Sequence, residues 1–252
     1  MKKILAVLLL VFMAITVFAE DAVLKDTEPS LFDYITWRGD LTFDQAPFNE
    51  LDSAILAMLT YLDYGDIDIG SGAKALTLTE VANRYFAAES RYDATENFMI
   101  IWQHCIYMLE QAAKSKRFGS IEMHDYVNVI DTKTQLQFSA ITFSLAKNRH
   151  YVAYRGTDGT LVGWKEDCNL AVKKEVPAQK KASAYLEDIS KRYEGKLIIG
   201  GHSKGGNLAL YAAGKAAKDT RDKIESVWNF DGPGFLDNKV VKDTLKTYGN
   251  KI

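Results

Sequence analysis

The chain has 252 residues, of which 47% are hydrophobic and 25% charged, with only four prolines. These proportions exclude a disordered or fibrous protein and indicate a globular domain with a substantial core. The formal net charge is -2 and no run of basic residues occurs, which argues against nucleic acid or an anionic membrane as an electrostatic partner.

The first segment, MKKILAVLLLVFMAITVFAED, has the pattern of a secretory signal peptide. Two lysines precede an apolar stretch from Ile4 to Phe18, and Val17 and Ala19 predict cleavage after Ala19. An uncleaved anchor is the weaker alternative, because the apolar run falls short of the roughly 20 residues that a spanning helix needs. We therefore expect an exported protein, periplasmic or extracellular, with no stable membrane span after cleavage.

A signal peptide over 1–19 and a polar linker over 20–30 are expected to precede one domain over 31–252. Residues 31–116 show mostly helical patterns. FNELDSAILAMLTYLDY has apolar residues at helical spacing, with Pro47 placed for a first helical turn. Thr77 stands three residues before Glu80, which is the spacing of a capping box, and a long periodic segment, TENFMIIWQHCIYMLEQAAKSK, follows.

Residues 117–252 show strands and then alternating strands and helices. SIEMHDYVNVID, LQFSAITFSLA and HYVAYRG are rich in branched and aromatic residues and predict strands. Beyond Gly159 the order is helix PAQKKASAYLEDISKRY, strand KLIIGG, helix KGGNLALYAAGKAAK, strand SVWNFDG and helix NKVVKDTLKTYG. This alternation predicts an α/β fold with a mostly parallel sheet flanked by helices.

The cysteines and histidines give no cofactor pattern. Cys105 and Cys168 are the only cysteines, and the sequence leaves open whether they pair. The four histidines show no paired metal-ligand spacing: His104, His124, His150 and His202. We expect no metal and no other cofactor.

IIGGHSKGGNLALYAAG places Ser203 where an apolar strand meets a helix. Gly201 to Gly205 match G-x-S-x-G, which is the nucleophile elbow of α/β-hydrolases when it falls at such a junction. The turn exposes the serine hydroxyl at the edge of the sheet, over a helix N-terminus that favours negative charge. The sequence therefore predicts Ser203 as a catalytic nucleophile.

Arg155-Gly156-Thr157 follows another apolar strand, and Trp164 and Asp167 come about ten residues later. Together with G-H-S-x-G-G, this pattern resembles class 3 lipases. In that family the residue after R-G and the residue after the serine donate backbone N–H groups to the oxyanion. The resemblance thus implies this role for the backbones of Thr157 and Lys204.

The chain is also similar to the poorly characterised Mbeg-like family of α/β-hydrolases. The segments that carry this resemblance are FDYITWRGDLTFDQAPFNELDSAILAMLTYLDY, YVAYRGTDGTLVGWKEDCNLAV, GGHSKGGNLALYAA and NFDGPGF. Lys204 departs from the apolar residue usual in the lipases, and a cation at a helix N-terminus opposes the helix dipole. Its side chain has three alternative partners: an anionic substrate, a neighbouring carboxylate or solvent.

A serine nucleophile needs a histidine base and a carboxylate that orients it, in the chain order Ser, Asp, His. Asp231, at the end of the strand after the elbow helix, is the candidate acid, with a turn-forming role as the alternative. No histidine follows His202, which is adjacent to Ser203 and points away from it, while His124 and His150 lie in or before upstream strands. We expect either a chain that ends before the base or a pseudoenzyme that retains the elbow.

The sequence thus predicts an exported serine hydrolase that cleaves a small-molecule or lipid ester through an acyl-Ser203 intermediate. The alternative is a non-catalytic secreted binding protein on a hydrolase scaffold, because a fold and an elbow do not by themselves establish turnover. The sequence does not indicate the oligomeric state.

Overall fold

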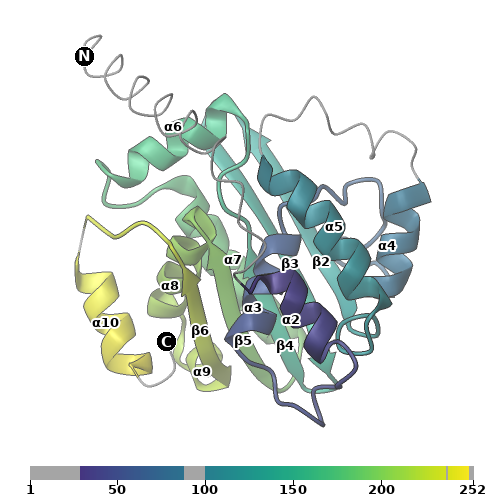
Figure 1. Ribbon diagram of the computed structural model, residues 1–252. Helices are drawn as coiled ribbons and strands as arrows, with labels where there is room; N and C mark the ends of the chain where they lie inside the picture. Colours follow the sequence, from purple (N-terminus) through teal and green to yellow (C-terminus); the bar gives the residue numbers. More distant parts are fainter. Residues whose placement is uncertain (1–28, 88–99, 237, 250–252) are drawn as a thin grey trace.

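The computed structural model describes residues 29–87, 100–236 and 238–249, so the expected signal peptide and most of the linker lie outside the described residues. Within these ranges a six-stranded sheet lies between two groups of helices (Figure 1). No helix in this part of the chain is long and apolar enough to cross a bilayer.

The N-terminal part is helical, as predicted. Its helices are α2 (Leu31–Arg38), α3 (Glu50–Leu59), α4 (Leu78–Ala87) and α5 (Ile100–Lys114). Helix α2 is absent from the sequence prediction, although the Ser30 hydroxyl and the Asp33 carboxylate form its capping box.

Two sequence signals for the start of a helix, the Thr77/Glu80 spacing and Pro47, can be compared with the structure. Thr77 and Glu80 form the expected capping box, with the Thr77 N–H donating to Glu80 Oε2 at 2.8 Å. The prediction for Pro47 is wrong, because α3 begins at Glu50. Asn49 caps α3 by accepting from the N–H of Leu51 at 2.9 Å, and this cap places Pro47 outside the helix.

The sheet is mixed rather than mostly parallel. Its strands lie side by side in chain order: β1 (Leu76–Thr77), β2 (Glu122–Asp131), β3 (Leu136–Ala146), β4 (Arg149–Tyr154), β5 (Lys196–His202) and β6 (Ile224–Phe230). The first three pairings are antiparallel and the last two are parallel. Short turns join β2 to β3 and β3 to β4, so those strands reverse direction, whereas helical crossovers keep β4, β5 and β6 parallel.

The crossover helices follow the predicted alternation with two additions. The structure contains α6 (Leu161–Leu170), α7 (Pro177–Arg192), α8 (Lys204–Lys215), α9 (Lys218–Lys223) and α10 (Asn238–Tyr248). Pro177 occupies the first turn of α7, where a missing N–H costs nothing. Helices α6 and α9 were not predicted, because neither carries a clear apolar stripe.

Alternation along the strands divides the interior into two cores on opposite faces of the sheet. Tyr151 and Ala153 pack into the core under α2 to α5, whereas Val152 and Tyr154 pack into the core under α7 and α8. Because neighbouring side chains of a strand point to opposite faces and both faces are covered, the run from Tyr151 to Tyr154 of β4 is continuously apolar. The fold is therefore the α/β sheet flanked by helices that the sequence predicts, with a helical N-terminal part, except that half of the sheet is antiparallel.

A buried ion pair joins α3 to the segment that follows α5. The guanidinium of Arg117 donates to both carboxylate oxygens of Asp52, at 2.6 Å from Nε and 2.5 Å from Nη2. Its remaining N–H groups reach the carbonyls of Leu41, Ala46 and Pro47 at 3.0–3.3 Å. This fully bonded cation holds the loop between α2 and α3, so the loop needs no regular structure of its own.

Candidate active site

Ser203 lies between the last residue of β5 and the first residue of α8. Its backbone has φ 55° and ψ -130°, a conformation that a non-glycine residue adopts only at a cost of about 1–3 kcal/mol. The Ser203 N–H donates to the carbonyl of Phe230 at 2.8 Å, which ties the turn to the end of β6. The half-buried side chain thus occupies the sharp strand-to-helix turn that the motif predicts.

The flanking glycines are required by close backbone contacts. A Cβ at Gly201 would lie 2.4 Å from the carbonyl carbon of Gly205, and a Cβ at Gly205 would lie 2.1 Å from the carbonyl oxygen of Tyr154. Neither contact can be relieved by rotating a side chain, because both involve backbone atoms. This geometry explains both glycines of G-x-S-x-G.

Ser203 lines an open pocket of about 450 Å³. Asp231, Gly232 and Pro233 border it after β6, and Trp164, Asp167 and Cys168 border it from α6. Burial raises the pKa of Asp167, partly offset by Lys204 and Thr157. The resemblance to lipases drew attention to Trp164 and Asp167, but only the structure shows that α6 forms a wall of the pocket.

The loop after β4 lies against the elbow. Tyr154 is the register partner of Gly201, so the chain leaving β4 runs beside the chain leaving β5. A Cβ at Gly156 would lie 2.8 Å from the carbonyl oxygen of His202. Thr157 is buried in this loop, and Lys204 is the first residue of α8, whose opening N–H groups lack intrahelical acceptors. The structure therefore brings together the two chain segments that carry the proposed oxyanion donors.

The side chain of Lys204 takes the second of its three alternatives, a neighbouring carboxylate. Its Nζ lies 2.9 Å from Glu166 Oε2, and both side chains are inaccessible to solvent. Burial lowers the pKa of Lys204, and Glu166 partly offsets this effect. Lys204 thus presents no charge to the pocket, and any role there belongs to its backbone.

Asp231 directly follows β6 and faces the same pocket as Ser203. The residue has φ 53°, and Gly232 donates its N–H to Asn229 Oδ1 at 3.0 Å, so a tight turn follows the strand. The structure places the predicted acid and the predicted nucleophile at neighbouring strand ends, because His202 and Phe230 are register partners.

None of the four histidines, all of which lie in the described ranges, lines this pocket. His202 Nδ1 lies 2.7 Å from the Tyr61 hydroxyl, and burial lowers the pKa of its imidazole. Its ring therefore packs beside the elbow, as expected from its position next to Ser203. His104 contacts Phe32, on the helical face of the molecule.

His124, Asp125 and Ser144 form a Ser-His-Asp contact at the start of β2, far along the strands from the elbow. His124 Nδ1 lies 2.7 Å from Asp125 Oδ2, and Nε2 lies 2.8 Å from Ser144 Oγ. The same hydroxyl also contacts His150 Nδ1 at 2.9 Å. Asp125 is further bound by Arg192 and Tyr193, at 2.6 Å each. These extra partners and the burial of His124 identify a structural network. The sequence could not reveal this network, because the residues that form it lie on three strands and at the end of a helix.

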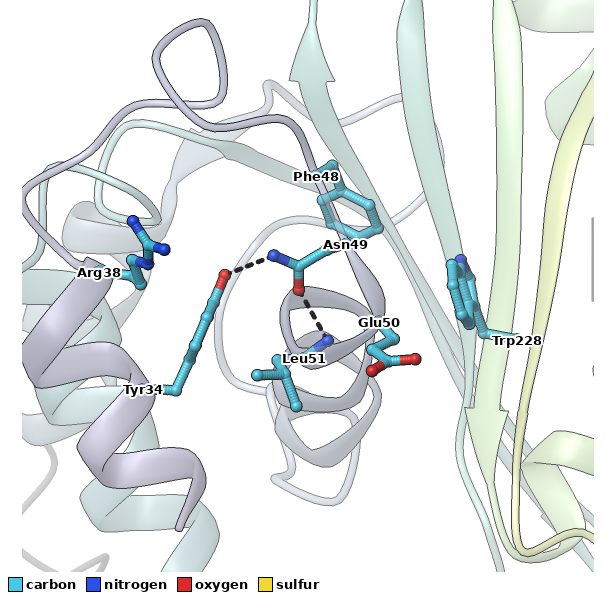
Figure 2. A pocket seen from close by; sticks show the side chains of 7 residues that line it. All are labelled: Tyr34, Arg38, Phe48, Asn49, Glu50, Leu51 and Trp228. Carbon is cyan, nitrogen blue, oxygen red and sulfur yellow. Dashed lines mark hydrogen bonds between the residues drawn. The ribbon is translucent and has the colours of Figure 1, made fainter. Parts of the chain in front are cut away.

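A second pocket, of about 640 Å³, lies between α2, the start of α3 and β6 (Figure 2). Tyr34 and Trp228 stand on opposite sides of it in Figure 2. Asn49, which also lines the pocket, donates to the Tyr34 hydroxyl at 2.8 Å and caps α3. None of the predicted site residues lines this pocket.

The two cysteines are unpaired. Cys105 is buried in α5, where burial raises the pKa of its thiol to about 12, and Cys168 is exposed at the pocket. The structure thus answers the question of pairing that the sequence left open.

Comparisons with known proteins give a family and distant structural likenesses. A family model described as Mbeg1-like matches residues 112–252, more than half of the chain. No curated protein matches this sequence. Among solved structures, the chain is similar to M37 lipase, with a TM-score of 0.45 and 14% identity over 81% of this chain and 65% of that chain.

Two further lipases show weaker likeness. The lipase from Rhizopus microsporus var. chinensis has a TM-score of 0.36 and 16% identity over 74% of this chain and 70% of that chain. A deletion mutant of the Rhizomucor miehei lipase in a propeptide complex has a TM-score of 0.35 and 14% identity, over 75% of this chain and 61% of that chain. The chain thus spans less than two thirds of M37 lipase.

Proposed function

We propose that this chain, which belongs to the Mbeg1-like family, is a serine hydrolase that cleaves a carboxylic ester through an acyl-Ser203 intermediate. The observation that carries the proposal is the strained backbone of Ser203 beside an open pocket. Strain of this kind persists only where the surrounding structure enforces it, and it concentrates at functional sites.

In the proposed reaction, Ser203 Oγ attacks the ester carbonyl carbon while its proton passes to a base. The carbonyl oxygen becomes an oxyanion, which the N–H groups of Thr157 and Lys204 stabilise. Collapse of this intermediate breaks the bond to the alcohol, which leaves with a proton, and water then releases the acid by the same steps. Asp231 is the proposed carboxylate of the catalytic triad, whose role is to orient the base.

A small-molecule or lipid ester would fit the openness of the pocket and the lipase-like fold. We also propose that the protein is exported, on the basis of the leader ending at Ala19. N-terminal sequencing of the protein recovered from a secreting culture tests this point: a mature chain beginning at Glu20 supports export, and an intact Met1 in the cell fraction contradicts it.

A fluorophosphonate probe tests the catalytic proposal, because it labels only serines that are activated as nucleophiles. We expect labelling of the wild-type chain and of Ser144→Ala, and none of Ser203→Ala. Ser144→Ala is the matched control, since Ser144 does contact a histidine, at 2.8 Å from His124 Nε2, in the network away from the pocket. Labelling that is absent from the wild type, or that survives Ser203→Ala, would overturn the proposal.

The second candidate function is binding without turnover. It is favoured by one observation, that no histidine lines the pocket among the described residues. This candidate predicts no labelling of Ser203 but retention of a small ester in the pocket, which thermal stabilisation of both wild type and Ser203→Ala would reveal.

A further inference from the structure

Three polar side chains are buried between the elbow, α6 and the sheet. Gln137 of β3, Glu166 of α6 and Lys204 of α8 each have no solvent-accessible side-chain surface. Burying polar and charged groups is costly unless every one is hydrogen-bonded. The partners of these groups therefore indicate what the network holds in place.

Lys204 uses all three donors of its ammonium. Nζ donates to the Gln137 carbonyl oxygen at 2.9 Å, to Gln137 Oε1 at 2.5 Å and to Glu166 Oε2 at 2.9 Å. Three acceptors satisfy all three donors of the ammonium. The side chain thus anchors the first residue of α8, whose own N–H is a proposed oxyanion donor, to β3 and α6.

Glu166 is bonded on both carboxylate oxygens. Oε2 also accepts from the N–H of Gln137 at 3.0 Å, and Oε1 accepts from the N–H of Ala178 at 2.9 Å. Ala178 lies in the first turn of α7, where free N–H groups and the helix dipole favour a carboxylate. The carboxylate therefore joins α6, α7, α8 and β3 at one point.

Gln137 reaches the loop that carries the other proposed donor. Its Nε2 donates to the carbonyl oxygen of Gly156 at 3.5 Å. This carbonyl and the N–H of Thr157 belong to the same planar peptide unit and point in opposite directions. Holding the oxygen on the Gln137 side therefore turns the Thr157 N–H to the opposite side.

We infer that Gln137, Lys204 and Glu166 are positioning residues that brace the two oxyanion donors against each other. The inference rests on the proposed function, since it assigns the network a role in the same reaction. The side-chain amide of Gln137 contacts the segments that carry both donors: Oε1 accepts from Lys204 Nζ, and Nε2 donates to the carbonyl oxygen of Gly156. Donors fixed before the reaction stabilise an oxyanion without the cost of reorganisation.

Gln137→Met tests the brace, because a methionine side chain has a similar volume but neither accepts from Lys204 nor donates to Gly156, while the backbone carbonyl of residue 137 still accepts from Lys204. We expect kcat to fall about 10- to 100-fold with KM within about twofold, since a small displacement of a donor weakens only the charged intermediate. The affinity for a trifluoromethyl ketone, which carries an oxyanion once Ser203 has added to its carbonyl, should fall by a similar factor.

Thr142→Val is the matched control. It removes another buried hydrogen bond of β3, 2.8 Å to the Tyr185 hydroxyl, away from the elbow, and should leave kcat and inhibitor affinity unchanged. Should Gln137→Met fail to fold, Gln137→Glu keeps an acceptor for Lys204 while removing the amide donor at neutral pH, and the same losses are expected.

The outcomes separate this inference from the function on which it depends. An active wild type whose kcat and inhibitor affinity are unchanged in the folded Gln137 variant overturns the brace alone. A wild type that neither labels at Ser203 nor hydrolyses esters overturns both. A drop in kcat equal to that of Thr142→Val would mean general loosening of the fold, and it also overturns the brace.

Discussion

The ammonium of Lys204 and the carboxylate of Glu166 are 2.9 Å apart in a part of the interior that solvent does not reach. Removing one partner leaves the other charge buried and unpaired, so Lys204→Met or Glu166→Gln should destabilise the fold by about 3–5 kcal/mol. The double variant Lys204→Met/Glu166→Gln should lose much less than the sum of the two single losses. Urea unfolding of the four chains measures this coupling, and additive losses would contradict it.

Ser203→Gly should stabilise the protein relative to Ser203→Ala by about 1 kcal/mol, because glycine adopts positive φ without a Cβ penalty. The alanine variant is the matched control: it also lacks the hydroxyl but keeps the strained backbone at φ 55°. Both variants should lose fluorophosphonate labelling. Equal midpoints in urea unfolding would mean that the turn stores no strain.

Gly205→Ala should destabilise the fold by about 2–4 kcal/mol, because its Cβ would approach the Tyr154 carbonyl oxygen to 2.1 Å. Backbone must move to relieve this contact, and the same movement would displace the start of α8. Gly234→Ala is the control, since no atom lies within 4 Å of its Cβ position. Its unfolding free energy should change by less than about 0.5 kcal/mol.

Asp125 should make stability depend on acid pH. Burial alone would raise the pKa of its carboxyl, but hydrogen bonds from His124, Tyr193 and Arg192 outweigh it and lower the pKa to about 2. A pKa below the ordinary value of 3.8 means that the folded state holds the proton less tightly than the unfolded state. The stabilisation, on the order of 1–2 kcal/mol, is therefore present above about pH 4 and is lost as the pH falls toward 2.

Asp125→Asn tests this dependence, since asparagine also tolerates the positive φ of 55° at this position. The variant should be less stable at pH 7 and should lose less stability between pH 6 and pH 2.5 in urea titrations. Asp131→Asn, at a carboxyl that is less buried than that of Asp125, should change the pH profile less. A parallel profile for wild type and Asp125→Asn would contradict the prediction.

Local patterns in the sequence account for much of the scaffold and for the elbow. The spacing of the glycines around Ser203 and the pairing of Thr77 with Glu80 are patterns of neighbouring residues, which a sequence shows directly, although the contact that requires Gly205 is made with Tyr154 of β4. The apolar runs of β4 and β5 likewise follow from burial on both faces of a sheet. Such features can be predicted because the residues that form each pattern are close together in the sequence.

Tertiary structure decided the rest, because the partners are far apart in the chain. Glu166 meets Lys204 across 38 positions and Gln137 meets it across 67, so no spacing rule could pair them. The pocket wall that α6 forms and the network around Ser144 also arise from packing between residues that are distant in the chain. The sequence alone thus determined where a reactive serine could stand, and only the folded chain determined which side chains surround it and hold it there.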